Sequence, residues 1–377
     1  MKIPLLDMKA QIDPIRKEIE EAISRVIDSG AFVLGKEIEE FERDICSYTG
    51  AKYAIGVSNG TDAISLALEA LEIDKGDKVI CPAFTYFATA GAIIHAGAEP
   101  VFVDIDPKTY CISSESIKVF LQRTMNNELR TVKAIIPVHL YGQTVDMDKI
   151  MDIAKERNLK VVEDTAQAFG STYKDKKAGT IGDCGSISFF PAKNLGAFGD
   201  AGMIITNKED AAKKLKSLRN QGSDPKVKYR HILNGHNNRL DTIQAAVLRI
   251  KLKHLDKWNK KRADNAAYYN ESLKGTGLLI PQLQDGSTHI YHQYILRAKN
   301  NADRERILAH LNKKGIDSRV YYPIPLHLQP SFEYLGYKKG DFPESEKAAL
   351  ETFAIPVYPE LTKEQMDYII AAIKERL

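Results

Sequence analysis

A chain of 377 residues exceeds what one hydrophobic core usually supports, which predicts a large domain and a smaller one. Its net charge of +3 is too small and too evenly spread to indicate a nucleic-acid surface. The four cysteines lack metal-ligand spacing, and neither a signal-peptide core nor a long uncharged apolar run occurs, so we expect a cytoplasmic protein with reduced thiols.

The first 50 residues favour helices. Apolar residues recur at helical spacing from Ile12 to Ser29, and a second helix is expected from Lys36 to Thr49. Between them, Phe32, Val33 and Leu34 form an apolar loop flanked by glycines. This loop could clasp a ligand or a partner subunit, but packing in the core is the interpretation we favour.

Strands and helices then alternate as far as residue 163. The expected strands cover residues 53–57, 79–82, 100–104, 132–138 and 160–163, and the expected helices cover 63–71, a small-residue segment ending at 95, 114–125 and 147–157. This alternation predicts an α/β fold with a mainly parallel, doubly wound sheet. Ligands of such sheets bind at the carboxyl ends of the strands.

Several polar or aromatic residues follow these strand ends. Gly60, Thr61 and Asp62 begin a helix, where free backbone N–H groups could bind a phosphate, although plain N-capping is the simpler explanation. Tyr86 could lie flat on a planar ring or fill the core. Asp164 ends a buried strand and needs a partner, either a protonated ring nitrogen or one of the chain's own cations.

Two more carboxylates, Asp104 and Asp106, lie close together in an Asp-x-Asp-Pro segment. This pattern is typical of a turn, so we expect no metal there or elsewhere in the chain.

Lys193 is the most unusual residue of the sequence. It follows a short run of β-branched and aromatic residues, 186–190, and among the small and apolar residues around it only Asp200 is charged. Partial burial would lower the pKa of this lysine and give an amine that forms Schiff bases with carbonyl compounds, including pyridoxal phosphate. The alternative is a lysine that snorkels from the end of a strand.

The chain after Lys193 begins with an expected antiparallel strand at 201–206. Helices are expected at about 208–220 and as one long helix from 241 to about 273. The segment 223–239 between them is polar and basic, and contains Lys226, Asn237 and Arg239. It could contact phosphates or another subunit, or it could be a solvated loop.

The pattern changes from about residue 275 onward. Expected strands at 291–296 and 318–321, with helices at 304–314 and 362–376, predict a smaller α+β domain joined to the first through the helix that contains Trp258. We place the domains at residues 1–250 and 251–377. His327, which lies in a proline- and leucine-rich stretch, is a ligand contact or a packed histidine, and we favour the contact.

Five motifs occur in order along the chain: Ser-Asn-Gly-Thr-Asp-Ala (58–63), Pro-Ala-Phe-Thr-Tyr (82–86), Glu-Asp-Thr-Ala-Gln (163–167), Ser-Phe-Phe-Pro-Ala-Lys-Asn-Leu-Gly (188–196) and Gly-His-Asn-Asn-Arg-Leu-Asp (235–241). Together they resemble the DegT/DnrJ/EryC1/StrS family of pyridoxal phosphate-dependent sugar-nucleotide aminotransferases. The resemblance implies the aspartate aminotransferase fold (fold type I), with a seven-stranded sheet between helices in the large domain.

The resemblance also implies roles for individual residues. Lys193 would bind the cofactor covalently and later move a proton, Asp164 would pair with the pyridine nitrogen, Gln167 would contact the ring oxygen, and Tyr86 would stack on the ring. The cofactor phosphate would be held by the backbone of Gly60, Thr61 and Asp62 together with the Ser188 hydroxyl.

A second group of residues is implied to act on the substrate or on a second subunit. Asn237 would reach the phosphate of the neighbouring subunit's cofactor, so the resemblance implies a homodimer with shared active sites. Arg239 and Tyr322 would lie near the sugar and the carboxylate of the amino donor, and Lys226 and His327 near the pyrophosphate. The chain departs from the family pattern at Ala192, where Thr or Ser is frequent, and at Ala201, which replaces a common glycine.

The implied reaction moves the amino group of L-glutamate onto a nucleotide-linked keto-sugar, giving an amino sugar for an O-antigen, another polysaccharide or a natural product. The motifs look most like those of enzymes that act on 3-keto sugars, which favours a dTDP-3-keto-6-deoxyhexose over a UDP-linked 3-keto or a 4-keto sugar. Alternatives from other classes are a non-catalytic regulator that binds the cofactor, and a dehydratase or lyase.

Overall fold

The computed structural model describes residues 1–124 and 129–377, so the expected end of a helix at residue 125 lies outside it. Its central sheet has seven strands in the order β1-β9-β8-β5-β4-β2-β3. They are β1 (Tyr53–Val57), β2 (Lys78–Pro82), β3 (Glu99–Val103), β4 (Val132–Ile135), β5 (Lys160–Asp164), β8 (Cys184–Ser188) and β9 (Gly202–Thr206). β9 pairs antiparallel with β1 and β8, and the other pairs of neighbouring strands are parallel, which confirms the mostly parallel α/β sheet.

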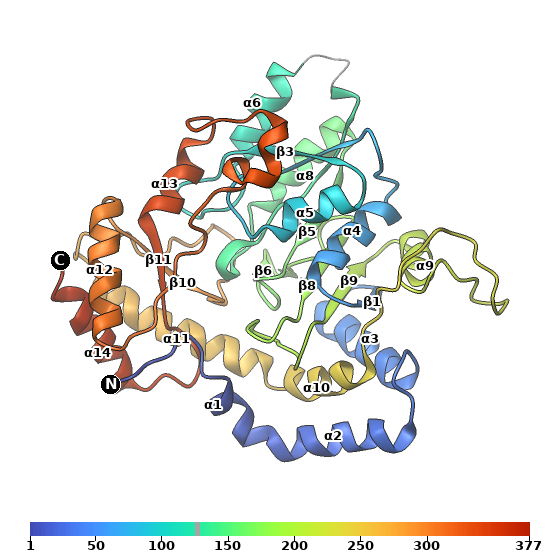
Figure 1. The fold of residues 1–377 in the computed structure, drawn as a ribbon, viewed down its shortest axis with the longest axis horizontal. Helices are drawn as coiled ribbons and strands as arrows, with labels where there is room; N and C mark the ends of the chain where they lie inside the picture. Colours follow the sequence, from blue (N-terminus) through green and yellow to red (C-terminus); the bar gives the residue numbers. More distant parts are fainter. Residues whose placement is uncertain (125–128) are drawn as a thin grey trace.

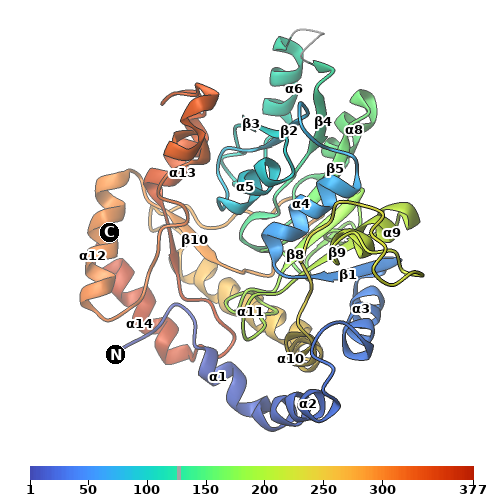
Figure 2. The same ribbon diagram turned by 45° about the vertical axis from the view of Figure 1, so that its right-hand side comes forward.

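Helices cover both faces of this sheet (Figures 1 and 2). They are α3 (Lys36–Thr49), α4 (Gly60–Ala70), α5 (Ala88–His95), α6 (Ser114–Arg123), α8 (Met147–Arg157), α9 (Glu209–Leu218) and α10 (Thr242–Leu252). The first helices, α1 (Met8–Ile12) and α2 (Arg16–Ser29), lie outside this layer, where α2 packs on α10. Side chains alternate between the two faces along each strand. On β9, Ile204 packs in the core that contains α4, whereas Met203 and Ile205 pack in the core that contains α3 and α10.

The C-terminal part has its own small sheet and core. The antiparallel strands β10 (Tyr294–Arg297) and β11 (Thr352–Ile355) pack with α11 (Leu255–Leu273), α12 (Asn301–Lys313), α13 (Pro343–Glu351) and α14 (Lys363–Lys374). Ile3, from the N-terminal segment, is buried in the core of α11, α12 and α14, so the start of the chain is fixed there. Both termini lie on the side of α12 and α14 (Figure 1). A short hairpin, β6 (Thr172–Tyr173) and β7 (Lys176–Lys177), completes the strands.

Several expected elements differ in the structure. The long helix expected from 241 to 273 is two helices, because the chain turns at Lys253 and His254 between α10 and α11. The strand expected at 132–138 ends at Ile135, and the strand expected at 318–321 is reduced to one bridge between Arg319 and Ala354. The core packing that we favoured for the loop 31–34 is wrong for Phe32 and Val33, which are about half exposed.

The expected helix at 63–71 begins earlier, at Gly60, and this difference matters for the site. The Asn59 side chain caps α4 by accepting from the backbone N–H of Asp62 at 2.9 Å, so Gly60, Thr61 and Asp62 form the first helical turn. In the part of the chain that the structure describes, no helix combines the length and the apolar character needed to cross a bilayer.

Candidate active site

A cavity of about 590 Å³ opens at the carboxyl ends of the parallel strands. It lies beyond the ends of β2, β5 and β8 and beside the start of α4. Ligands of open α/β sheets bind at the carboxyl ends of the strands, so this is the expected position. Nearly all residues assigned to cofactor binding line it: Gly60, Thr61, Asp62, Tyr86, Asp164, Gln167, Ser188 and Lys193, joined by Tyr322 from the C-terminal part.

The start of α4 forms one wall of this cavity. First-turn N–H groups have no acceptor within their own helix, so those of Gly60 and Thr61 are available to an anion. A Cβ on Gly60 would lie only 2.6 Å from the Cβ of Ser188, so only glycine lets the helix approach the end of β8 this closely. The resulting cradle, with the Ser188 hydroxyl beside the helix N-terminus, fits a phosphate group.

Asp164 ends β5 and is 5% exposed. One carboxylate oxygen accepts from the Thr89 hydroxyl at 2.9 Å and the other from the backbone N–H of Ala166 at 3.1 Å. No lysine, arginine or histidine nitrogen of the described residues lies within the 4.0 Å ion-pair distance of this carboxylate. A buried carboxylate without a cation suits the protonated ring nitrogen of a cofactor better than it suits a structural role.

Lys193 faces the same cavity from the loop after β8. Burial disfavours its ammonium form and lowers its pKa to about 8, although the nearby charge of Asp164 acts in the opposite direction. The side chain keeps some exposed area because it faces the cavity, and it is the protein packed around it that weakens its hydration. The amine is thus both accessible and a better nucleophile than a surface lysine.

The loop that carries Lys193 is held by several contacts. Its own N–H donates to Phe190 O at 2.8 Å, and the N–H of Ala197 donates to Phe189 O at 2.8 Å. The Asn194 amide donates to Asn259 Oδ1 at 2.7 Å. A Cβ on Gly196 would lie 2.2 Å from Pro191 O, so this turn also requires glycine. The backbone around the lysine is therefore fixed before any ligand arrives.

Gln167 and Tyr322 contact each other on the opposite side. Gln167 accepts from the backbone N–H of Tyr141 at 2.9 Å and donates from Nε2 to the Tyr322 hydroxyl at 2.9 Å. Because Nε2 carries a second hydrogen, the contact with a ring oxygen stays a prediction. Tyr86 is 58% exposed, and its ring centroid lies 5.9 Å from that of Tyr322, so its face is free to cover a planar ring.

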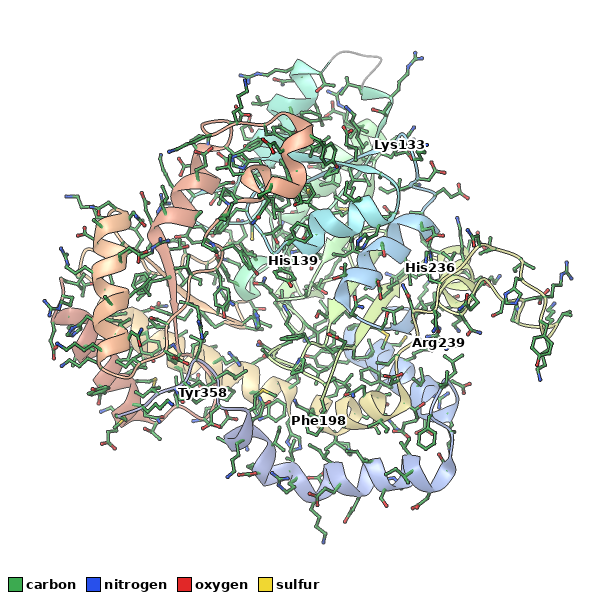
Figure 3. The ribbon with its side chains drawn as sticks, viewed as in Figure 1. Lys133, His139, Phe198, His236, Arg239 and Tyr358 are labelled. Atoms are coloured by element: carbon green, nitrogen blue, oxygen red, sulfur yellow. The ribbon has the colours of Figure 1, made fainter. Side chains whose placement is uncertain are left out.

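Four of the predicted site residues do not line the cavity. His327 is 2% exposed, bonds through Nε2 to Glu346 Oε1 at 3.1 Å and packs edge-on against Phe342. This placement corresponds to the packed histidine, not to the ligand contact that we favoured. Lys226, Asn237 and Arg239 lie in the basic segment that extends beyond α9, and Figure 3 shows Arg239 at its base.

Three histidines near the site were not identified from the sequence: His95, which lines the cavity, His292 and His139. His292 lines the cavity and bonds through Nδ1 to Asn194 Oδ1 at 3.1 Å, and burial beside Lys193 and Arg262 holds its pKa well below the usual value. The only signal for His292 was the grouping of two histidines and a tyrosine within residues 289–292, just before β10.

His139, which is labelled in Figure 3, lies next to the end of β5. Its Nδ1 accepts from the N–H of Val145 at 3.1 Å, so its Nε2 is the donor to Glu163 Oε2 at 2.9 Å. Glu163 is fully buried and also accepts from three backbone N–H groups, those of residues 179, 181 and 182. The backbone N–H of His139 also donates to the backbone oxygen of Asp164 at 3.0 Å. The network around His139 therefore fixes the end of β5, which carries Asp164.

Comparison of the sequence with known proteins identifies a family. Residues 13–374 match the DegT/DnrJ/EryC1/StrS aminotransferase family. Over at least 98% of both chains, the protein is 47% identical to a pleiotropic regulatory protein of Geobacillus stearothermophilus and 40% identical to a UDP-N-acetyl-3-dehydro-alpha-D-glucosamine 3-aminotransferase of Acidithiobacillus ferrooxidans. It is 42% identical, over 98% of each chain, to a dTDP-3-amino-3,6-dideoxy-alpha-D-galactopyranose transaminase of Aneurinibacillus thermoaerophilus.

Solved structures agree with this assignment. DesV of S. venezuelae, in complex with a ketimine intermediate, superposes with a TM-score of 0.94 at 38% identity and covers 99% of this chain and 98% of its own. NtdA of Bacillus subtilis, with its cofactor PMP bound, gives a TM-score of 0.90 at 34% identity over 100% of this chain and 85% of its own. As its five motifs predicted, the chain belongs to the DegT/DnrJ/EryC1/StrS aminotransferase family, whose cofactor is pyridoxal phosphate.

Proposed function

We propose that the protein transfers the amino group of L-glutamate to the ketone of a nucleotide-linked 3-keto sugar, most directly a dTDP-3-keto-6-deoxyhexose. The observation that carries the proposal is Lys193, an accessible amine of lowered pKa that shares one cavity with Asp164, a buried carboxylate that forms no ion pair. The names of the Aneurinibacillus and Acidithiobacillus relatives support amination at C3 of the sugar, and they leave a UDP-linked sugar as the alternative.

When bound, pyridoxal phosphate supplies an electron sink for the carbon that loses or gains a proton. The chain supplies the rest. Asp164 would keep the ring nitrogen protonated, and the first turn of α4 with Ser188 would anchor the phosphate. Tyr86 would cover one face of the ring. Lys193 Nζ would hold the cofactor and would carry the proton to and from the substrate carbon as a general acid and base.

We further propose a cytoplasmic homodimer in which each subunit completes the other's site. Lys226, Asn237 and Arg239 do not line the cavity of their own chain, and the basic segment that carries them extends beyond α9 into solvent (Figure 1). Tyr229, in the same segment, is 84% exposed, which is unusual for an aromatic residue unless another molecule covers it.

Mixed dimers test this arrangement. Lys193→Ala and Asn237→Ala variants, each inactive alone, should regain about a quarter to a half of the activity when co-refolded, because one site in the hybrid then has both residues. A monomer in sedimentation, or no recovery in the hybrid, would refute the shared site.

The main experiment follows the visible band of the lysine-bound cofactor. Glutamate should abolish the band, and a keto-sugar from a panel of dTDP- and UDP-linked 3-keto and 4-keto sugars should restore it. Mass and NMR analysis of the product then fixes the position of the new amine. A dehydratase or lyase would turn over without consuming glutamate stoichiometrically.

The name of the Geobacillus relative favours a second candidate, a regulator that binds the cofactor without turnover. Such a protein would keep its band unchanged when glutamate is added. The reactive geometry of Lys193 gives a regulator no advantage, so we place the aminotransferase first.

A further inference from the structure

A side pocket of about 80 Å³ adjoins the main cavity. The two share Ala192, His292, Gln293 and Tyr321 as lining residues, so they lie against each other at these residues. The other walls of the side pocket are apolar, except for a single arginine, and come from the N-terminal segment and from β11 and the residues after it: Leu5, Leu6, Ala354, Ile355 and Val357.

That arginine is Arg262, which lies on α11 and is 3% exposed. Its guanidinium donates from Nη1 to the backbone oxygens of Tyr291 at 3.2 Å and His292 at 3.4 Å. Its Nε is buried and has no acceptor. Of the carboxylates that the structure describes, none lies within 4.0 Å of this guanidinium, although Glu360 is close enough to attract it.

Such an arginine is costly to the fold. A guanidinium has five N–H donors, and a buried charge without a partner is strongly unfavourable. The unpartnered Nε–H of Arg262 needs an acceptor, and an unsatisfied buried donor that lines a pocket indicates that a ligand completes it.

We propose that this side pocket is the carboxylate subsite for the amino donor, and that Arg262 binds one carboxylate of the donor amino acid there. The inference rests on the proposed function. The pocket has room for a carboxylate and one or two methylene groups but not for a sugar ring, so it separates the donor from the keto-sugar in the larger cavity. A guanidinium binds a carboxylate through two parallel N–H···O bonds, and apolar walls strengthen that bond.

The test compares the two half-reactions of the holoenzyme. In Arg262→Gln, single-turnover kcat/KM for L-glutamate should fall about 100-fold or more, whereas reaction of the aminated enzyme with its keto-sugar should stay within about threefold of the wild-type. Glutarate, a dicarboxylate without an amine, should bind at least about tenfold more weakly in calorimetry. L-alanine, which lacks the distal carboxylate, shows which carboxylate Arg262 binds. If Arg262 binds the α-carboxylate, kcat/KM for L-alanine should fall in Arg262→Gln as much as kcat/KM for glutamate. If Arg262 binds the distal carboxylate, kcat/KM for L-alanine should not change.

Two further variants keep the test decisive. Arg304→Gln replaces another buried arginine, on α12, and should leave both half-reactions unchanged. Leu6→Trp fills the pocket and leaves the Arg262 side chain in place, so it should weaken the binding of glutamate and glutarate but not of the keto-sugar, even if Arg262→Gln fails to fold. Wild-type donor kinetics in both Arg262→Gln and Leu6→Trp would overturn the subsite, whereas a wild-type enzyme that reacts with no amino acid would overturn the proposed function itself.

Discussion

Burial of Lys193 should cost the cofactor-free protein stability, and this cost should depend on pH. The pKa of the lysine is about 8 in the folded chain against 10.5 for an ordinary lysine. Below pH 8 the amine is charged in both the folded and the unfolded state, so the folded state bears the whole cost of burying the charge. Above pH 10.5 the amine is neutral in both states and the cost vanishes.

The magnitude follows from linkage. One pKa unit corresponds to about 1.4 kcal/mol, so the fall from 10.5 to about 8 amounts to about 3 kcal/mol. Lys193→Met, which replaces the amine with an apolar side chain of similar length, should therefore stabilise the apoprotein by about 3 kcal/mol at pH 7. The gain should shrink as the pH rises from 8 to 10.5, because the unfolded chain then holds the proton that the folded chain has already released.

The assay measures the free energy of unfolding of the apoprotein in urea at several pH values between 7 and 10.5. Subtracting the wild-type value from that of the variant removes the contribution of all other titrating groups. Lys253→Met, an exposed lysine just after α10, serves as the matched control and should show no pH-dependent gain. The rate at which apoprotein captures pyridoxal phosphate should also rise with pH, with an apparent pKa near 8. A stability difference that does not change with pH, or capture that rises only near pH 10, would refute the reasoning.

Three further substitutions test the rest of the site. Gly60→Ala places a Cβ 2.6 Å from that of Ser188 and should weaken pyridoxal phosphate binding about tenfold or more in an absorbance titration, because the helix must move away from β8. Asp164→Asn removes the charge that holds the ring nitrogen protonated and should lower kcat about 100-fold or more while the cofactor stays bound, as steady-state kinetics and the visible spectrum will report. Glu163→Gln cannot accept from three backbone N–H groups and His139 together, and should lower the free energy of unfolding by about 3 kcal/mol in urea titrations.

The part of the site that lies on parallel strands could be predicted from the sequence. Strand ends of a doubly wound sheet meet at one edge, so marking Gly60, Tyr86 and Asp164 as residues just past strand ends was enough to group them. The neighbouring carboxylates Glu163 and Asp164 show the limit of that method. The pleat sends them to opposite faces of β5, and only the packed structure shows which one reaches the cavity and which one serves the network of His139.

The parts of the site that depend on contacts distant in sequence could not be predicted. Arg262 lies within a helix whose spacing shows only that it is amphipathic, and its approach to residues 291 and 292 depends on how α11 packs against the segment before β10. The turn between α10 and α11 carries neither proline nor glycine, so the sequence offers no sign of the break that orients α11.

A lowered pKa is not by itself what makes Lys193 the reactive residue. Burial also lowers the pKa of Lys251 to about 8, yet this lysine is fully buried and its ammonium donates to Gly196 O beneath the loop that carries Lys193. An aldehyde can reach only the amine that faces the cavity, so access separates the two. The buried lysine holds the loop, and the accessible one reacts, which means that the same desolvation serves structure at one position and chemistry at the other.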